Sequence, residues 1–466
     1  MPRDVSLPTP ARAAVTLERR LGPFDAAAIV ISNVIGVGIF YVPIIVAAMV
    51  PQGVGMLLVW VIGGALAFAG AMAYAELASV RPKAGGEYVY LRDAYGPLAA
   101  FLTGWTSFVA GFSGAIAAGA IALADYVGRF VPAAASATPI FIIPIPWLPL
   151  IVSPRAIVAL VAIGALSLLH MRGLGPGSFV QNVLAGIKVS ALVTFVALGF
   201  ALGHGSVSHV VSHTALPVSG MLLALVPVMF CYSGWNAAAY VAEEVRDPGR
   251  NVPLALGLGT VAVVLIYVAL NALYLYAIPI SELAALADGR LVDTVAERLF
   301  GFTAGSLLAV FTIVSISASV SAMVIAGPRV YYAMARDGMF LPRAATVHAQ
   351  FRTPASAIVA QAVWSGVLVL CGTLSQLVSY TGFAVVLFAG IAVVALFVLR
   401  RREPDAPRPF RAWGYPWAPA IFIVASAAMV VNEIARNGTT ALVGVAVIAM
   451  GVPVYYLFAK QRLTSG

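Results

Sequence analysis

The sequence predicts an all-α polytopic membrane protein with about twelve transmembrane helices, two of them broken near the middle. Of the 466 residues, 61% are hydrophobic and only 10% are charged, whereas a soluble domain carries roughly 25% charged residues. The mean hydropathy is +0.98. This composition excludes a soluble globular protein and predicts a chain that lies mostly in lipid.

Apolar stretches long enough to cross a bilayer recur along the whole chain. A single span needs about 20 mostly apolar residues. The connections between these stretches are too short for a soluble domain, and the longer ones include 279–301, which is expected to hold a short amphipathic helix. The candidate spans are 24–50, 53–79, 97–129, 154–171, 176–203, 217–243, 253–278, 302–334, 354–372, 376–400, 416–435 and 439–459.

The positive charges indicate the topology. Lys and Arg residues gather in the two tails and in the loops on the same side as the tails. Because these residues favour the cytoplasmic side, we expect both termini in the cytoplasm and the chain in a cell inner membrane. The net charge of +9 is thus a topology signal, and nucleic acid is not an expected partner. The few arginines of the opposite side are Arg129, Arg155, Arg290, Arg298 and Arg436.

Two spans, 24–50 and 217–243, each hold a glycine-containing segment near the middle that we expect to break the helix. We call residues 36–40 the first break and residues 230–236 the second break. A helix interrupted inside a bilayer survives only where its freed backbone groups are buried in protein or line a cavity. Two breaks at matching positions therefore indicate a substrate site near the membrane midplane.

The breaks also predict a repeat. Each opens a unit of five spans, at 24–203 and 217–400, and because five is odd the second unit enters the membrane from the opposite side. The expected architecture is a five-plus-five inverted repeat. Residues 416–459 add two further spans, and 1–23 and 460–466 are the cytoplasmic tails.

The two breaks offer backbone groups of opposite polarity. The N–H groups of Val37, Gly38 and Ile39 suit a carboxylate, because the start of a helical segment carries free N–H groups and a positive dipole end. Carbonyl groups freed around Ser233 suit an ammonium group. Together they match an amino-acid zwitterion. The alternative for Gly36 and Gly38 is close packing between helices.

Polar and aromatic side chains surround the second break. Phe230, Tyr232 and Trp235 either pack against other helices and lipid, or one of them closes over a ligand. Asn236 either contacts the substrate or makes a hydrogen bond between helices, and both interpretations stay open.

Lys188 lies inside the span 176–203. A charge near the bilayer centre costs several kcal/mol, and such groups are usually functional and paired. The alternative is that the side chain reaches the interface. In the functional interpretation, the charged Lys188 side chain occupies the position that a coupling cation would otherwise take. If the side chain titrates, proton coupling is possible; if it stays charged, exchange would not depend on a cation. Its hydroxyl partner is expected among the serines of 302–334, with Ser319 as our choice from Ser315, Ser317, Ser319 and Ser321.

Motifs for catalysis, nucleotide binding or metal binding do not occur in the sequence. We therefore expect no enzyme activity, no cofactor and no metal. Cys231 and Cys371 lie in apolar stretches, which favours free thiols over disulfides. A monomer without a disulfide-linked partner is the simplest expectation.

Several motifs resemble one transporter family. Gly36-Val37-Gly38-Ile39-Phe40 is similar to the GSGIF-type motif of the amino acid–polyamine–organocation (APC) superfamily. Residues 82–88 and 91–96 resemble its linkage between the second and third spans. Residues 230–236, followed by Glu243-Glu244, resemble the L-type amino acid transporters and their bacterial relatives. The resemblance runs from about 24 to 420 and implies the LeuT-type inverted-repeat fold with two added helices.

The resemblance also implies roles for individual residues. It places the substrate carboxylate at Val37 and Gly38, makes Phe230 the occluding aromatic residue and Asn236 a pocket contact, and matches Lys188 to a lysine found where other members bind sodium. The sequence departs from the family pattern at two positions: Val37 stands where Ser or Thr is commoner, and Ser233 stands where Gly is commoner. Both departures favour small or medium neutral substrates. The implied acceptors for the substrate amine are the carbonyls of Val34, Phe230, Cys231 and Ser233.

The expected function is secondary active transport of amino acids by alternating access, by sodium-independent exchange or proton-coupled uptake of neutral amino acids. One alternative is a cationic amino-acid or polyamine exchanger, which would need an acidic residue beside a break; the sequence places none there. A second alternative is a membrane sensor that binds without transport.

Overall fold

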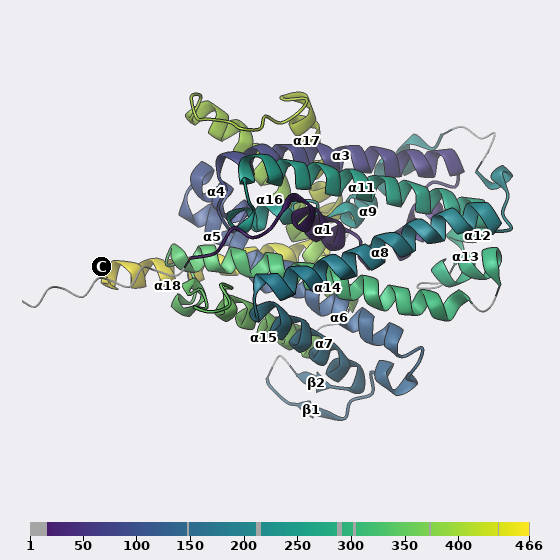
Figure 1. Ribbon diagram of the computed structural model, residues 1–466, viewed down its shortest axis with the longest axis horizontal. Helices are drawn as coiled ribbons and strands as arrows, with labels where there is room; N and C mark the ends of the chain where they lie inside the picture. The colour runs from purple at the N-terminus through teal and green to yellow at the C-terminus, as the bar shows by residue number, and fades with distance from the viewer. Residues whose placement is uncertain are drawn as a thin grey trace, which may run out of the picture.

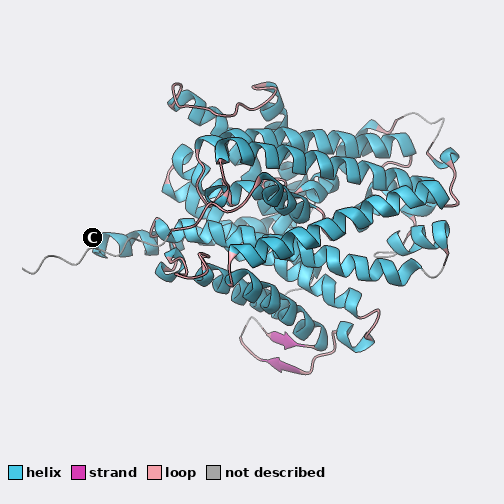
Figure 2. Cartoon of the chain, viewed as in Figure 1, coloured by secondary structure: helices cyan, strands magenta, loops and turns pink. Residues whose placement is uncertain are grey.

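The computed structural model describes residues 16–146, 149–210, 216–286, 291–301, 304–371, 374–436 and 438–465. The described chain is almost entirely helical, and its long helices run roughly along one axis (Figures 1 and 2). Within the described residues, eight helices are long and apolar enough to cross a membrane. The expected all-α membrane fold is therefore confirmed, while the count of about twelve spans and the inverted repeat stay predictions.

The long helices account for most of the expected spans. They are α3 (Gly53–Val80), α5 (Pro97–Thr106) continued by the π-helix η2 (Ser107–Gly111) and α6 (Phe112–Val127), α7 (Pro154–Met171), α8 (Leu174–Leu202), α11 (Pro248–Ala277), α14 (Ala304–Arg336), α15 (Ala355–Cys371), α16 (Leu374–Arg402), α17 (Trp417–Arg436) and α18 (Gly438–Ser465).

Shorter helices make up the two broken spans and the connections. The broken spans contain α1 (Pro23–Val34), η1 (Val37–Phe40) and α2 (Val42–Met49), then α9 (Val218–Tyr232) and α10 (Ala237–Tyr240). The others are α4 (Glu87–Tyr95), η3 (Pro132–Ala135), η4 (Val207–His209), η5 (Ala242–Glu244), α12 (Ile280–Ala284), α13 (Leu291–Phe300) and η6 (Pro342–Ala345).

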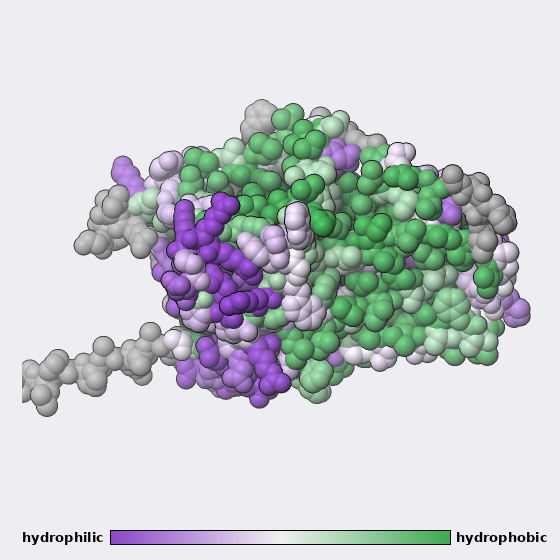
Figure 3. All heavy atoms as spheres, turned by 90° about the horizontal axis from the view of Figure 1, so that it is seen from above, coloured by the Kyte–Doolittle hydropathy of each residue, from purple (hydrophilic) through white to green (hydrophobic). Residues whose placement is uncertain are grey.

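The surface reflects a lipid environment. Hydrophilic side chains gather at one end of the molecule, where α4 and the end of α16 lie, and apolar side chains cover most of the rest of this face (Figures 1 and 3). Large apolar side chains such as Leu222 and Val363 are more than half exposed along the helices. In water this exposure would be unfavourable, but lipid tails are as apolar as these side chains.

The broken spans lie in the centre of the helix bundle. α1 packs against α11, α14 and α8, and α3 packs against α11 and α9 (Figure 1). The connection at 279–301 contains the expected amphipathic helix as α13, which buries Leu291, Val295 and Leu299. The connection at 130–153 holds an antiparallel hairpin of β1 (Phe141–Ile143) and β2 (Leu150–Val152), an element that the sequence analysis did not anticipate.

Candidate functional site

The first break begins where α1 ends at Val34. Gly36 adopts an extended conformation, with φ −115° and ψ −153°, before the 3₁₀-helix η1 starts at Val37. In such a helix each N–H bonds the carbonyl three residues earlier, so the N–H of Ile39 faces the carbonyl of Gly36. The N–H groups of Val37 and Gly38 come before the first of these bonds and are the ones that remain for another acceptor.

The second break lies between α9 and α10. Gly234 has a φ of +99°, a left-handed conformation that favours glycine. A Cβ at this position would lie 2.7 Å from Nδ2 and 3.0 Å from the carbonyl oxygen of Asn33, in the last turn of α1. Asn33 Nδ2 also donates to the carbonyl of Gly234 at 3.2 Å. The two breaks thus lie against each other, and a glycine is required at the contact.

Gly38 extends this contact toward α9. A Cβ on Gly38 would lie 3.1 Å from Sγ and 3.6 Å from Cα of Cys231. Cys231 is buried and is a free thiol. Residues predicted separately on the two breaks therefore lie in contact with each other.

Tyr267 of α11 bridges the two breaks, and the sequence analysis did not identify it. Its hydroxyl lies 2.9 Å from the carbonyl oxygen of Val34 and 3.3 Å from that of Cys231. Both carbonyls are among those expected to bind a substrate amine. The sequence carried no signal for this residue, because a tyrosine in an apolar helix is usually a packing residue.

Protein donors already reach three of the four expected carbonyls. The carbonyl of Val34 accepts from the N–H of Gly36 as well as from Tyr267, which uses both of its lone pairs. The carbonyl of Phe230 accepts from the N–H of Ser233 at 3.0 Å. Because the Tyr267 hydroxyl has one hydrogen, it donates to Val34 or to Cys231 but not to both at once. The carbonyls of Phe230 and Cys231 therefore each keep at least one lone pair for an ammonium group.

Lys188 is fully buried in α8, and its ammonium group reaches the end of α1. Nζ donates to the carbonyl oxygens of Ser32 at 3.3 Å and Ile35 at 2.5 Å, and to Ser319 Oγ at 3.1 Å. An ammonium group has three donors, so these contacts satisfy it completely. The side chain therefore ends inside the protein and does not extend to the membrane–water interface.

Ser319 of α14 is the serine that the structure brings to Lys188. Its Oγ also lies 2.8 Å from the carbonyl oxygen of Ser32 and 2.7 Å from that of Ile35. Since a hydroxyl has one hydrogen, it donates to one of these while it accepts from Lys188. The other serines of the group lie elsewhere, with Ser317 bonded to Ile313 and Ser321 to His170.

Asn236 makes a hydrogen bond between helices. Its Nδ2 donates to Glu87 Oε1 at 2.7 Å and to the Tyr240 hydroxyl at 3.1 Å. Glu87 also accepts from the Tyr74 hydroxyl at 2.6 Å. The expectation that no acidic residue lies beside either break is therefore wrong, because α4 is distant in sequence and only the fold brings Glu87 there. The substrate contact of Asn236 stays a prediction.

The comparison with known sequences agrees with this geometry. The family model described as amino acid permease matches residues 21–458. The chain belongs to the amino acid permease family. The predicted membership of the APC superfamily is thus confirmed.

Curated relatives cover nearly the whole permease. It is 29% identical to the human "Large neutral amino acids transporter small subunit 2" over 95% of this chain and 81% of that protein. It is 28% identical to the "Serine/threonine exchanger SteT" of Bacillus subtilis, over 96% and 98% of the two chains. A third relative, the mouse "b(0,+)-type amino acid transporter 1", is 27% identical over 96% of this chain and 89% of the relative.

The aromatic residues of the second break take different positions in the permease. Trp235 packs edge-on against Tyr74 of α3, with ring centroids 4.8 Å apart, and against Phe422 of α17. Tyr232 donates to the carbonyl of Trp60 at 3.0 Å. Both rings serve core packing in this conformation, whereas Phe230 is half-buried. The gating roles of all three stay predictions.

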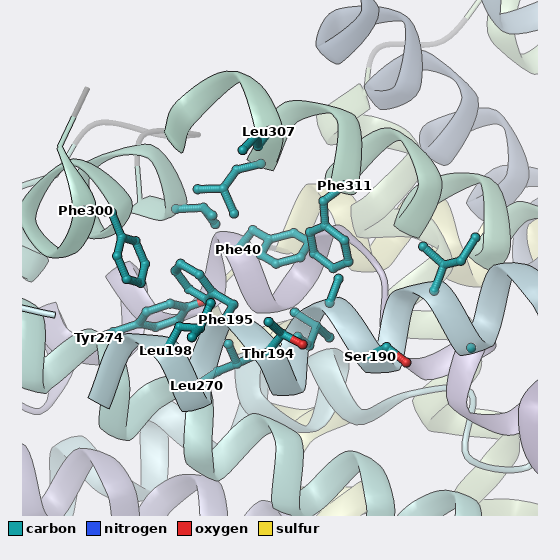
Figure 4. A pocket seen from close by; sticks show the side chains of 16 residues that line it. Phe40, Ser190, Thr194, Phe195, Leu198, Leu270, Tyr274, Phe300, Leu307 and Phe311 are labelled. Atoms are coloured by element: carbon teal, nitrogen blue, oxygen red, sulfur yellow. The ribbon is translucent and has the colours of Figure 1, made fainter. Parts of the chain in front are cut away.

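An apolar cavity of about 800 Å³ borders the first break through Phe40. In Figure 4, Phe40 and Phe311 lie together between α8 and α14, with Ser190 and Thr194 as polar side chains of the lining. The ring centroids of Phe40 and Phe311 are 6.4 Å apart at nearly a right angle. Phe40 is thus both the last residue of the first break and part of the lining of this cavity.

Ion pairs join the elements at the hydrophilic end of the permease. Arg329 of α14 pairs with Glu244 of η5 at 2.9 Å, and both side chains are almost completely buried. Arg336 pairs with Glu243 in a more exposed position. The backbone of Leu21, just before α1, bonds Glu244 and Arg246. These contacts hold the segments that flank both breaks together at one end.

Proposed function

We propose that this protein is a secondary transporter that moves neutral amino acids by alternating access without sodium, by exchange or together with protons. The observation that carries the proposal is the ammonium group of Lys188 among three oxygens at the end of α1. Oxygen ligands are those that hard cations take. A protein cation at this position removes the need for a bound sodium ion to support the first break.

The substrate would lie between the two breaks. The N–H groups of Val37 and Gly38 would bind its carboxylate, with Gly36 and Ile39 shaping the backbone around them. The carbonyls of Phe230, Cys231 and Ser233 would bind its amine. Because the carbonyl of Val34 already has two donors, its contribution requires the Tyr267 hydroxyl to turn toward Cys231 alone. The half-buried ring of Phe230 would close over the ligand.

The names of the relatives support amino-acid transport. One names large neutral amino acids and another names exchange of serine and threonine. The absence of a charged side chain among the groups proposed to contact the substrate favours a neutral zwitterion. Exchange and uptake of neutral amino acids are therefore our proposal for this chain.

The inverted repeat completes the proposal. Residues 24–203 and 217–400 would be the two five-span units, each opened by a broken helix, with 416–459 outside them. The hydrophilic end (Figure 3) would face the cytoplasm together with both termini. In a bacterial-type cell the membrane would be the inner membrane, and we propose a monomer without a disulfide-linked partner.

A cationic amino-acid or polyamine exchanger is the second candidate. Glu87 favours it, because its carboxylate bonds Asn236 of the second break. Against it, the Glu87 carboxylate already accepts hydrogen bonds from Tyr74 and Asn236 of the protein itself.

Uptake into proteoliposomes tests the proposal. Purified protein is reconstituted with internal serine, leucine or arginine, and labelled serine, leucine or arginine is added outside, with and without an imposed sodium gradient. We expect exchange of a neutral amino acid that does not change when choline replaces sodium. Strict sodium dependence would contradict the role of Lys188. Exchange limited to arginine would support the second candidate, and binding without flux would indicate a sensor.

A further inference from the structure

The carboxylate of Glu87 is buried at the contact between α4, α3 and the second break. Only 9% of the residue is exposed. Its Oε1 accepts from the Tyr74 hydroxyl and from Asn236 Nδ2, which also donates to the Tyr240 hydroxyl of α10. Glu87 thus joins the neighbouring helix α3 to the second break, which lies 149 residues away in the sequence.

Glu87 has no cationic partner among the described residues. The arginines of the same end pair with other carboxylates: Arg81 with Asp93 and Glu403, Arg92 with Asp93 and Asp337, Arg329 with Glu244, and Arg400 and Arg408 with Glu76. A buried carboxylate without a counter-ion is costly in its charged form. Protonation of Glu76 or Glu244 would break an ion pair. Protonation of Glu87 would not, among the described residues.

Among the described residues, three tyrosines interact with Glu87. Tyr74 comes from α3, Tyr90 from α4 itself and Tyr240 from α10. Glu243 of η5 accepts from the N–H of Ala84, three residues before Glu87, and pairs with Arg336 of α14. Arg329 of α14 and Glu244 of η5 pair with each other. The Tyr90 hydroxyl is buried without a partner in the described chain. Burial raises the pKa of Glu87, and the hydrogen bonds from Tyr74 and Asn236 oppose this rise.

We propose that Glu87 is a proton-binding site that couples the movement of a proton to the movement of the amino acid. The proposal rests on the transport function proposed above and selects the proton as the coupled ion. The step is a simple association: the carboxylate takes up one proton to become a neutral carboxyl group and later releases it.

The coupling follows from the bonds at the second break. As a carboxylate, Glu87 accepts charge-assisted hydrogen bonds, which are roughly twice as strong as neutral ones. Protonation removes the charge and weakens the bond to Asn236 Nδ2. Because Asn236 directly precedes α10, the proton would change how firmly the second half of the broken span is held to α4.

Net uptake under a pH gradient tests the proposal. Labelled serine and leucine uptake is measured in proteoliposomes with symmetric pH and with the inside about one unit more alkaline. For one proton per substrate, one pH unit is equivalent to 1.4 kcal/mol and drives accumulation by up to about tenfold. We expect wild type to show this accumulation. Glu87→Gln should lose it and also transport more slowly, while Glu87→Asp should retain a pH response because it still titrates.

Matched measurements separate the outcomes. Glu282→Gln, on the partly exposed Arg298–Glu282 pair, should behave as wild type. Size-exclusion chromatography and exchange at symmetric pH verify that Glu87→Gln is folded. Wild-type exchange without any response to the gradient, or a full response in Glu87→Gln, would overturn the proton assignment alone. A complete lack of amino-acid exchange by wild type would overturn the proposed transport function as well.

Discussion

The ammonium nitrogen of Lys188 lies 2.5 Å from the carbonyl oxygen of Ile35, the residue that caps the end of α1. A carbonyl at a helix end has no intrahelical donor, and inside a membrane water cannot replace it. The lysine therefore supplies the donor that the broken helix lacks, and the helix supplies the acceptors that a buried ammonium needs.

Replacement of Lys188 by Met should strongly impair transport. The variant leaves the carbonyls of Ser32 and Ile35 with Ser319 as their remaining side-chain donor, and an unsatisfied buried acceptor costs about 1–3 kcal/mol. We expect the exchange rate to fall by about ten- to a hundredfold, in line with this energy. The measurement is labelled amino-acid exchange at equal amounts of reconstituted protein. Lys83→Met, at an exposed site, is the control, and equal rates for the two variants would contradict the role of Lys188.

Replacement of Tyr267 by Phe should weaken the contact between the breaks. It removes the hydroxyl that bonds the carbonyls of Val34 and Cys231, at a cost of about 1 kcal/mol for a typical hydrogen bond. We expect a lower unfolding temperature in detergent and an altered KM for exchange. Tyr456→Phe, at a site that is 61% exposed, should change neither. An unchanged KM in Tyr267→Phe would argue that this hydroxyl lies outside the binding site.

Replacement of Gly234 by Ala should destabilise the protein. The backbone there has a φ of +99°, and the new Cβ would lie 3.0 Å from the carbonyl oxygen of Asn33. Strained backbone conformations of this kind cost about 1–3 kcal/mol. Gly164→Ala is the matched control, because its Cβ would meet no atom within 4 Å and alanine favours a helix. Thermal unfolding should separate the two variants, and equal stability would show that the breaks can move apart freely.

The two ion pairs of the hydrophilic end should differ in their contribution to stability. Breaking the buried Arg329–Glu244 pair leaves an uncompensated charge and costs about 3–5 kcal/mol. The Arg336–Glu243 pair, in which Arg336 is 50% exposed, contributes only about 0.2–1 kcal/mol. Glu244→Gln should therefore lower the unfolding temperature much more than Glu243→Gln. Similar shifts for both variants would mean that water reaches the Arg329 pair.

The membrane class and the places where the helices stop could be predicted from the sequence, because both depend on local composition. Apolar length decides which segments enter lipid, and glycines at 36, 38 and 234 decide where a helix can end. Lys188 was recognisable for the same reason, since a single charge in an apolar stretch has few ordinary explanations. Ser319 was one of four possible serines, and the helical period could not choose among them.

Other parts of the candidate site were decided only by the tertiary structure. Tyr267 and Glu87 carry no local signal, because a tyrosine in an apolar helix and a glutamate in a polar loop are both common. They matter here because packing brings the Tyr267 hydroxyl to two freed carbonyls and Glu87 to Asn236. Sequence composition determined that backbone groups would be freed inside the membrane. Which side chains satisfy those groups depends on contacts between residues far apart in the chain, and only the folded arrangement sets those distances.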